Sequence, residues 1–229
     1  MGEFRGFFKT HFVADIGQIR DKLTEDLTKA KRESGLVAIV FAIPKKPFVK
    51  NEVLPLVEIW NYRSKDYVTF FFVGWQGVED VDDSEFSDVF LDKNNPEGSF
   101  SAKTFDEAIE EFQGMGPWRY KGDTPLILCR GYLRYRKQTN EPRAFLDLES
   151  VIEFELERAL REGSIDSVES FFEVVIRVAK EAPGDVVHWR LSDQLGNRAL
   201  GDAIIEAITE KVKGAKRILN AIKFFRVKA

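Results

Sequence analysis

The 229-residue chain is 44% hydrophobic and 31% charged, which is typical of a folded globular protein and argues against intrinsic disorder. This length is enough for one large domain or two small ones. The formal net charge of −4 argues against nonspecific nucleic-acid binding by the whole molecule, although it leaves room for a local basic patch. The single cysteine, Cys129, excludes an internal disulfide and any CxxC motif.

No apolar run approaches the roughly 18 residues that a membrane-spanning helix needs. Residues 1–8 lack the apolar centre of a signal peptide, and a lone cysteine suits a reducing compartment. We therefore expect a cytoplasmic protein that has no contact with a membrane and needs no cofactor.

The first predicted element is a helix that begins at Asp15. Asp15 and Gln18 have the spacing of a capping box, and apolar residues recur from Ile16 to Leu27 at intervals of three and four. Gly35 is placed to end this helix.

The stretch from Gly35 to Gln76 predicts the centre of the fold. Residues 36–43 carry no polar side chain, and a second apolar run covers residues 68–73. Between them lies a helical pattern for which Asn51 is the predicted N-cap and Pro55 a first-turn residue. Two apolar runs joined by a helix predict parallel strands buried on both faces, with a right-handed crossover. The predicted class is α/β, with a central mixed sheet, a parallel βαβ core and flanking helices.

Residues 77–102 are rich in acidic side chains and predict a long loop. Some of its carboxylates have the spacing of an EF-hand, but Glu85 and Leu91 stand where that loop needs a glycine and a bidentate glutamate. We therefore expect no metal site here, and interpret the segment as a partner-binding loop or a solvated one.

Thr104 is predicted to open the next helix, and residues 126–129 form a third strand that continues, exposed, to a turn at residues 138–142. Residues 151–156 fit a helix by their capping box and a strand by their alternation; we favour a strand to about Glu155 and then a short helix to Gly163.

A helix is predicted from Ser167 to Lys180, then a short strand over residues 186–191, a long helix from Asp193 and a terminal strand over residues 223–227. The chain divides into an α/β core domain, 1–163, and a helical C-terminal extension, 164–229, packed on that core.

From Gly35 onward the order is strand, helix, strand, loop, helix, strand, strand, helix, which is similar to the thioredoxin fold, whose core is βαβ followed by αββα. Ile43-Pro-Lys-Lys-Pro47 lies where that family carries its CxxC, and Thr124-Pro125 lies where it has a cis-proline. Both redox cysteines are missing, so the resemblance implies a redox-inactive version that is used for binding. An open doubly wound α/β fold is the competing architecture.

A second resemblance covers residues 118–128 and 155–163. These stretches look like parts of poorly characterised bacterial proteins, some of which sit near antiviral defence systems. This resemblance implies no particular activity.

One candidate ligand site lies beyond the carboxyl ends of the first two strands, where ligands of parallel sheets gather. Lysines beside a helix N-terminus favour a phosphate or a carboxylate, but the glycines of a P-loop are missing. A solvated turn is the alternative interpretation. The candidate residues are Lys45, Lys46, Asn51, Trp75 and Gln76.

A candidate partner site is formed by Trp118, Arg119, Tyr120 and Asp123, in which the two aromatic residues would act as anchors. Aromatic and basic residues that alternate can also stack bases and neutralise phosphates. Further basic residues form two runs: Arg130, Arg134 and Arg136, and then Lys211, Lys213, Lys216, Arg217, Lys223, Arg226 and Lys228.

No residue pattern of a known catalytic site is present. Cys129 is predicted to be buried and inert, and His11 to be structural. His188, close to Asp185, is the one group that resembles acid–base chemistry, but two histidines make no relay or metal cluster.

Three hypotheses follow. The first is a non-catalytic cytoplasmic adaptor or sensor that binds a protein partner in a bacterial defence or signalling system. The second is an enzyme or a binder of an anionic ligand or nucleotide at the strand ends. The third is a nucleic-acid accessory protein that uses the basic runs.

Overall fold

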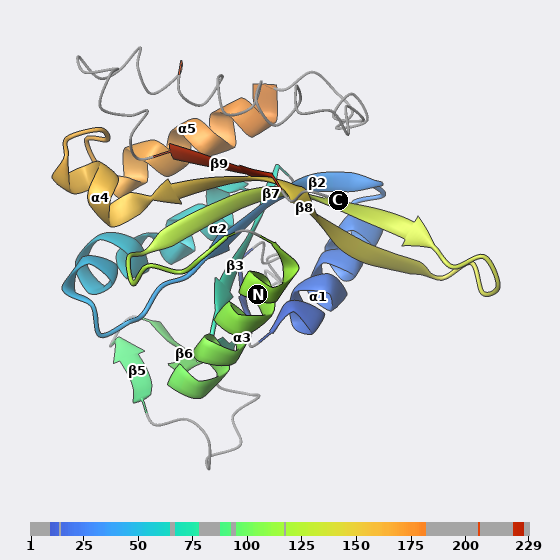
Figure 1. Cartoon of the computed structure of the whole chain (residues 1–229), viewed down its shortest axis with the longest axis horizontal. Coiled ribbons are helices and arrows are strands. Elements are labelled where there is room, and N and C mark those ends of the chain that lie inside the picture. The colour runs from blue at the N-terminus through green and yellow to red at the C-terminus, as the bar shows by residue number, and fades with distance from the viewer. Residues whose placement is uncertain are drawn as a thin grey trace, which may run out of the picture.

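The computed structural model describes residues 10–13, 15–64, 67–77, 88–92, 95–116, 118–181, 206 and 222–226. Its centre is a six-stranded mixed sheet of order β1-β3-β2-β7-β8-β9 (Figure 1). The α/β class with a mixed sheet is thereby confirmed. The strands are β1 (Thr10–Val13), β2 (Ser34–Val40), β3 (Val68–Val73), β7 (Pro125–Tyr135), β8 (Pro142–Glu155) and β9 (Ile222–Arg226).

The parallel part of the sheet is the βαβ unit that the sequence predicts. β1 and β2 both run parallel to β3, which lies between them. β7, β8 and β9 then follow β2 as antiparallel neighbours. Every residue of β3 is buried, including the one polar residue, Thr69, because helices cover both faces of a parallel sheet.

Helices cover both faces of the sheet (Figure 1). On one face, Phe41 packs against Phe105 and Phe112 of α3. On the other, Trp60 of α2 stacks on Phe172 of α5 with 3.8 Å between ring centroids. The helices are α1 (Ile16–Lys29), α2 (Val57–Ser64), α3 (Ala102–Met115), α4 (Leu156–Arg161) and α5 (Val168–Glu181).

The crossover between β2 and β3 differs from the prediction at its start. Helical backbone begins at Pro47, so Asn51 is not an N-cap: it lies in a π-turn, η1 (Val49–Val53), which a 3-10 turn, η2 (Leu54–Leu56), follows. The early start fits Pro47, whose fixed φ suits the first helical position, and the irregular turns fit Pro55, which has no N–H to bond to the carbonyl four residues earlier.

Two other helix starts follow from side-chain caps. Asp15 Oδ1 accepts from the backbone N–H of Gln18 at 2.8 Å, which confirms the predicted cap of α1. Helix α3 is capped by Ser101, whose Oγ accepts from the N–H of Thr104 at 3.2 Å. The prediction of Thr104 as the N-cap was therefore three positions too late.

The acidic region is more ordered than the sequence predicts. β4 (Trp75–Gly77), β5 (Asp88–Asp92) and β6 (Asn95–Phe100) form a small antiparallel sheet of order β4-β6-β5. The prediction of a continuous loop over residues 77–102 was therefore wrong for these segments. Strands that pair through their backbones are hard to recognise in so polar a sequence. Residues 78–87, with most of the EF-hand-like carboxylates, lie outside the described ranges.

The second half of the chain largely follows the prediction. β8 ends at Glu155 and α4 begins at Leu156, which resolves the strand-or-helix alternative as expected. β9, close to the terminal strand predicted over residues 223–227, lies at the edge of the sheet beside β8. The strand over 186–191 and the helix from Asp193 fall outside the described residues, and the boundary at 163 stays a prediction.

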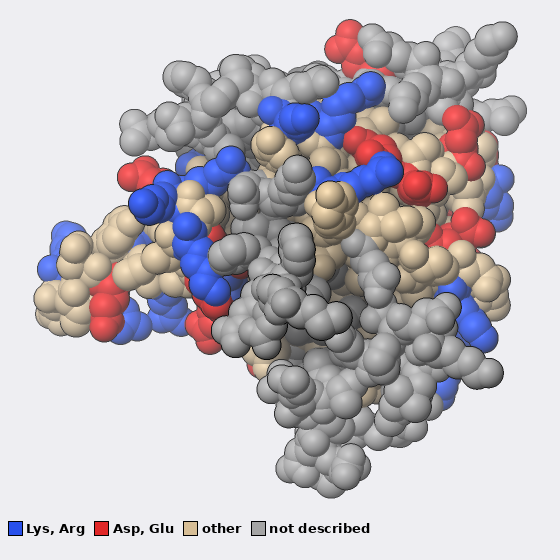
Figure 2. Space-filling view, turned by 180° about the vertical axis from the view of Figure 1, so that it is seen from behind, with Lys and Arg blue, Asp and Glu red and all other residues tan. Residues whose placement is uncertain are grey.

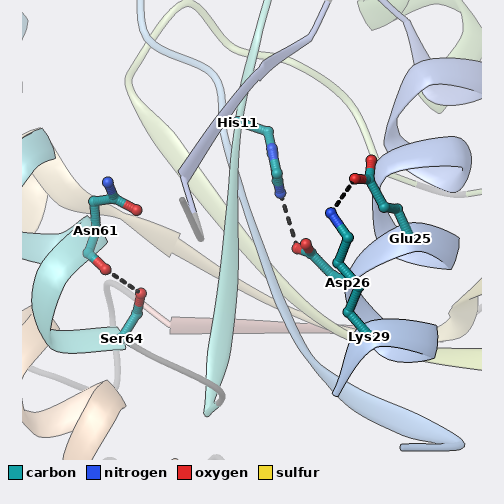
Figure 3. A network of polar contacts seen from close by, with 6 residues as sticks. All are labelled: His11, Glu25, Asp26, Lys29, Asn61 and Ser64. Atoms are coloured by element: carbon teal, nitrogen blue, oxygen red, sulfur yellow. Dashed lines mark hydrogen bonds and ion pairs between the residues drawn. The ribbon is translucent and has the colours of Figure 1, made fainter. Parts of the chain in front are cut away.

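Three smaller findings complete the fold. His11 Nε2 lies 2.8 Å from Asp26 Oδ2 of α1, and its ring stacks on Phe71, so its structural role is confirmed (Figure 3). Over the ranges described, every peptide bond is trans, including the one before Pro125, where the thioredoxin resemblance implied cis. In the same ranges no helix is both long enough and apolar enough to cross a bilayer.

Candidate functional site

Three segments meet at the end of the sheet where the parallel strands finish, here called the carboxyl edge: residues 43–47 after β2, residues 118–124 before β7, and the junction of β8 with α4. Lys46 Nζ donates to the carbonyl of Gly122. The N–H of Leu156 donates to the carbonyl of Thr124 at 3.3 Å. The edge thus brings part of the predicted ligand site next to part of the predicted partner site.

The predicted ligand residues do not converge there as a group. Lys45 is exposed and Lys46 half-buried at the edge, whereas Asn51 is exposed one helical turn further on. Trp75 is 3% exposed and its Nε1 donates to the carbonyl of Ala42 at 3.0 Å, so it fastens β4 to the end of β2 instead of facing a ligand. Gln76 lies in β4.

The predicted partner anchor Trp118 is a core residue. It is 4% exposed, and its ring lies 4.8 Å from that of Phe41 and 6.2 Å from that of Phe112. A side chain enclosed in this way cannot present an interface anchor, which corrects the prediction. The sequence could not reveal this, because the rings that enclose Trp118 come from β2 and α3.

Arg119 forms hydrogen bonds within its own chain. Its Nη1 donates to the carbonyls of Gln113, Gly116 and Trp118 at 3.1, 2.7 and 2.6 Å. These are unpaired acceptors around the C-terminus of α3, where a cation is favourable. Arg119 therefore closes a helix, and its role in partner binding stays a prediction.

Tyr120 keeps its proton near neutral pH. Burial, followed by the nearby charges of Asp123, Asp106 and Glu157, raises the pKa of Tyr120 to about 12. Over the residues that the structure describes, neither the Tyr120 hydroxyl nor the buried Thr124 Oγ1 has a hydrogen-bond partner. A neutral phenol is neither a base nor a nucleophile near neutral pH, but it can donate a proton or a hydrogen bond.

Thiol and metal chemistry have no support either. Cys129 is buried, as predicted, and burial together with the charge of Asp147 raises the pKa of its thiol. Such a thiol does not ionise near neutral pH and is inert. No group of three or more metal-binding side chains occurs in the described ranges.

A second surface, formed by the outer parts of β7 and β8, is rich in basic side chains. Residues 130–147, the distal parts of β7 and β8 with their turn, are here called the arm; residues 130–132 still pair with β2, and beyond them the arm projects from the body as a two-stranded ribbon (Figure 1). The arm carries five basic and two acidic residues, so its formal charge is +3 and the rest of the chain carries −7. Basic side chains lie along it with acidic ones between them (Figure 2). The basic residues are Arg130, Arg134, Arg136, Lys137 and Arg143.

One face of the arm is a stack of aromatic rings and guanidinium groups. Tyr132 pairs across the strands with Phe145, and their rings stack with centroids 6.0 Å apart. The Arg134 guanidinium carbon lies 5.1 Å from the centroid of Tyr132 and 5.4 Å from that of Phe145. Arg130 contacts the Tyr132 ring at 5.6 Å. Cations over ring faces in this way hold both groups in place.

The other face of the arm is held by α1. The backbone N–H of Ala144 donates to Thr24 Oγ1 at 2.8 Å. Gly131 lies so close to α1 that an added Cβ would stand 2.5 Å from Leu23 Cδ2. Further out on this face, Tyr135 is 53% exposed and pairs across the strands with Pro142.

Sequence reasoning identified Arg130, Arg134 and Arg136 but missed Arg143 and Phe145. The alternation within β7 is visible in the sequence, whereas the register that places β8 residues opposite it is not. His188, Asp185 and most of the C-terminal basic run fall outside the described residues.

Compared with known proteins, the chain matches no family model, no curated sequence and no solved structure at a significant level.

Proposed function

We propose that this protein is a non-catalytic binding domain that holds single-stranded nucleic acid along the arm. The observation that carries the proposal is the stack of Tyr132 and Phe145 beneath the guanidinium of Arg134, on a ribbon that projects from the body. Proteins that bind single strands combine aromatic platforms for bases with cations for the backbone.

The distribution of charge supports an anionic partner. The arm is positive and the remainder of the chain strongly negative, so electrostatic attraction directs a polyanion to the arm and repels it from the body. Four of the five arm cations are arginines. Arginine binds phosphate through two parallel N–H groups and stacks on planar rings, which lysine does not do.

The states of two potentially reactive groups, Tyr120 at the carboxyl edge and Cys129 within β7, support a binding role without catalysis. Cys129 is buried, and Tyr120 is protonated near neutral pH. A thioredoxin-like arrangement without redox activity, which we also propose, is supported by the parallel β2–α2–β3 unit followed by α3 and the antiparallel β7–β8 pair. The trans peptide bond before Pro125 departs from that family pattern.

The protein-partner hypothesis has less support. Of its two strongest predicted anchors, Trp118 is buried in the core and Arg119 binds a carbonyl at the end of α3. An acidic protein partner on the arm is therefore the alternative that an experiment has to separate from nucleic acid.

The test is fluorescence anisotropy with a labelled oligouridine of about 12 nucleotides, within the site size of single-strand binding modules. The exposed arginines are replaced in Arg134→Gln/Arg136→Gln/Arg143→Gln. The matched control is Lys103→Gln/Arg161→Gln/Lys180→Gln, which removes the same charge from exposed sites on three helices. We expect the arm variant to bind on the order of tenfold more weakly, and its salt slope to fall by about 2, since each phosphate contact on a single strand contributes about 0.7.

Equal losses in the two triple variants would mean that net charge, and not the arm, determines binding. An oligonucleotide that does not bind the wild-type protein at low salt overturns the proposal. In that case, capture of an acidic protein by the wild type but not by the arm variant would support the protein-partner hypothesis.

A further inference from the structure

The aromatic face of the arm carries three cross-strand pairs of side chains. Residues directly opposite each other in an antiparallel ladder share a face, and the faces alternate along each strand. Gly131 and Ala144, which lie against α1, occupy the alternate positions, so the aromatic face points away from α1. From the body outward, its pairs are Arg130 with Asp147, Tyr132 with Phe145, and Arg134 with Arg143.

The outermost of these pairs, Arg134 with Arg143, is here called the arginine rung. Like charges directly opposite each other destabilise a ribbon. Both side chains are exposed, and over the ranges that the structure describes neither of them forms an ion pair or a side-chain hydrogen bond. The rung therefore presents two guanidinium groups whose charge no carboxylate of those ranges neutralises.

The cations on either side of the arginine rung have acidic neighbours. Toward the body, Arg130 lies opposite Asp147 in the register. Toward the tip, Arg136 Nη1 lies 3.9 Å from Glu141 Oε2, and the N–H of Arg136 donates to the carbonyl of Glu141 at 3.0 Å. Two uncompensated positive charges are thus concentrated at one rung, between two places where a carboxylate accompanies the cation.

Two adjacent guanidinium groups fit a phosphate. Residues directly opposite each other have their Cβ atoms about 4.5–5.5 Å apart, so both long side chains can reach one anion. Each guanidinium can donate two parallel N–H groups to phosphate oxygens. A terminal phosphate monoester carries a charge of about −1.5 to −2 near neutral pH, which matches the two cations. A phosphodiester inside a strand carries only a single negative charge.

The neighbouring side chains indicate which part of a strand fits here. Tyr132 and Phe145 form the next pair toward the body, so a nucleotide whose phosphate binds the rung has its base within reach of their rings. Beyond these rings lies Asp147, and toward the tip lies Glu141; each carboxylate repels a second phosphate. A site for one phosphate and the base beside it suits the end of a strand better than its middle.

We infer that the arginine rung binds the terminal phosphate of the strand held on the arm, with the terminal base on Tyr132 and Phe145. This inference rests on the proposed function, because it assigns one end of that strand to a place on the arm. A 5′-phosphate and a 3′-phosphate have the same chemistry, and the experiment distinguishes them.

The test measures fluorescence anisotropy with oligouridines of one length, labelled on a central base, that have hydroxyl ends, a 5′-phosphate or a 3′-phosphate. A hydroxyl-ended strand that is one nucleotide longer adds a phosphodiester and controls for charge alone. We expect a phosphate-ended strand to bind on the order of tenfold more tightly than both hydroxyl-ended strands, because the monoester accepts more charge-assisted hydrogen bonds.

Arg143→Gln is the informative variant, because it leaves Arg134 in place over both rings. The ratio of phosphate-ended to hydroxyl-ended affinity should fall from about tenfold to below about threefold, whatever the change in either affinity alone. The matched control is Arg136→Gln, which removes the same charge nearer the tip, beside Glu141, and should retain the ratio.

The outcomes separate this inference from the proposed function. Equal affinity for all the strands overturns the terminal-phosphate inference and leaves the proposed function intact. A ratio that survives in Arg143→Gln, or that falls equally in Arg136→Gln, overturns the assignment to the arginine rung. A phosphoserine peptide that competes as well as a phosphate-ended strand would assign the rung to phosphorylated protein and overturn the inference. Failure of every strand to bind overturns the proposed function, and the inference falls with it.

Discussion

The carboxyl edge and the arm contain the same kinds of side chain, aromatic rings beside basic groups, in opposite arrangements. At the edge, the Trp118 ring lies in the core and Arg119 binds three backbone carbonyls. On the arm, Arg134 is exposed and lies over Tyr132 and Phe145, outside the layers of the body.

The difference follows from where each segment stands in the fold. Residues 118–124 cross from the end of α3 to the sheet, where apolar side chains of both close over them and helix carbonyls need a donor. The ribbon of the arm extends past its neighbouring strand β2, whose paired residues end opposite Tyr132. Alternation of aromatic and basic residues is therefore compatible with a core as well as with a surface.

Removal of the Trp118 ring should have the largest effect on stability. Trp118→Ala leaves a cavity among Phe41, Phe112 and Tyr120, so we expect the free energy of unfolding to fall by about 3–5 kcal/mol. Tyr135→Ala, at an exposed ring of the arm, should change it by less than about 0.5 kcal/mol. Urea denaturation of both variants measures the contrast, and similar losses would contradict the assignment of one ring to the core and the other to the surface.

A methyl group at Gly131 should have the next largest effect. Its Cβ would stand 2.5 Å from Leu23 Cδ2 and 2.9 Å from Val37 Cγ2, at the base of the arm. Such overpacking typically costs about 1–3 kcal/mol, so Gly131→Ala should lower the urea midpoint.

Gly114→Ala serves as the control for that variant. Gly114 lies in α3, where an added Cβ meets nothing within 4 Å. Alanine is the better helix former by about 0.5–1 kcal/mol, so this second variant should be slightly stabilised. A neutral result at Gly131 would show that α1 does not clamp the arm.

The sequence predicts the centre of the fold better than it predicts either surface. The apolar runs of β2 and β3 and the cap at Asp15 are local signals, and the structure has each of them where it was expected. Asn51 failed as a cap because helical backbone already begins at Pro47, so that Asn51 lies inside the helical run.

The candidate site depends on contacts between distant segments, which the sequence does not record. Nothing local to Trp118 reveals that Phe41 closes over it, and nothing local to Phe145 reveals that it stacks on Tyr132. The alternation of basic residues along β7 is visible in the sequence, because it is a property of one strand.

The pH dependence of stability should identify Tyr120 as a group of the interior. Because its pKa is raised to about 12 in the folded protein, the unfolded chain loses this proton first as the pH rises. The stability that Tyr120 contributes is complete below about pH 10 and is lost between pH 10 and 12. Urea midpoints should therefore fall across this range in the wild type and fall less in Tyr120→Phe. Parallel profiles for the two proteins would show that the phenol titrates as it does in water.

The same substitution at two threonines, one at the carboxyl edge and one in α1 against the arm, gives the most direct contrast. Thr124 is fully buried at the carboxyl edge and, in the described part of the chain, its Oγ1 has no partner. Thr124→Val replaces that hydroxyl by a methyl group of similar shape and should stabilise the protein by about 1 kcal/mol. Thr24→Val should instead destabilise it by about 1–3 kcal/mol, because the buried N–H of Ala144 loses its acceptor.

Whether Thr124→Val raises or lowers the free energy of unfolding then shows whether the Thr124 hydroxyl has a hydrogen-bond acceptor at the carboxyl edge. A stabilised variant, measured as a higher urea midpoint with an unchanged slope, means that the hydroxyl is a group for which folding provides no acceptor. A loss that matches the loss at Thr24 would mean that water or a ligand occupies the edge and accepts this hydrogen bond. The carboxyl edge would then be a binding surface in its own right, and the contrast with the arm would fail.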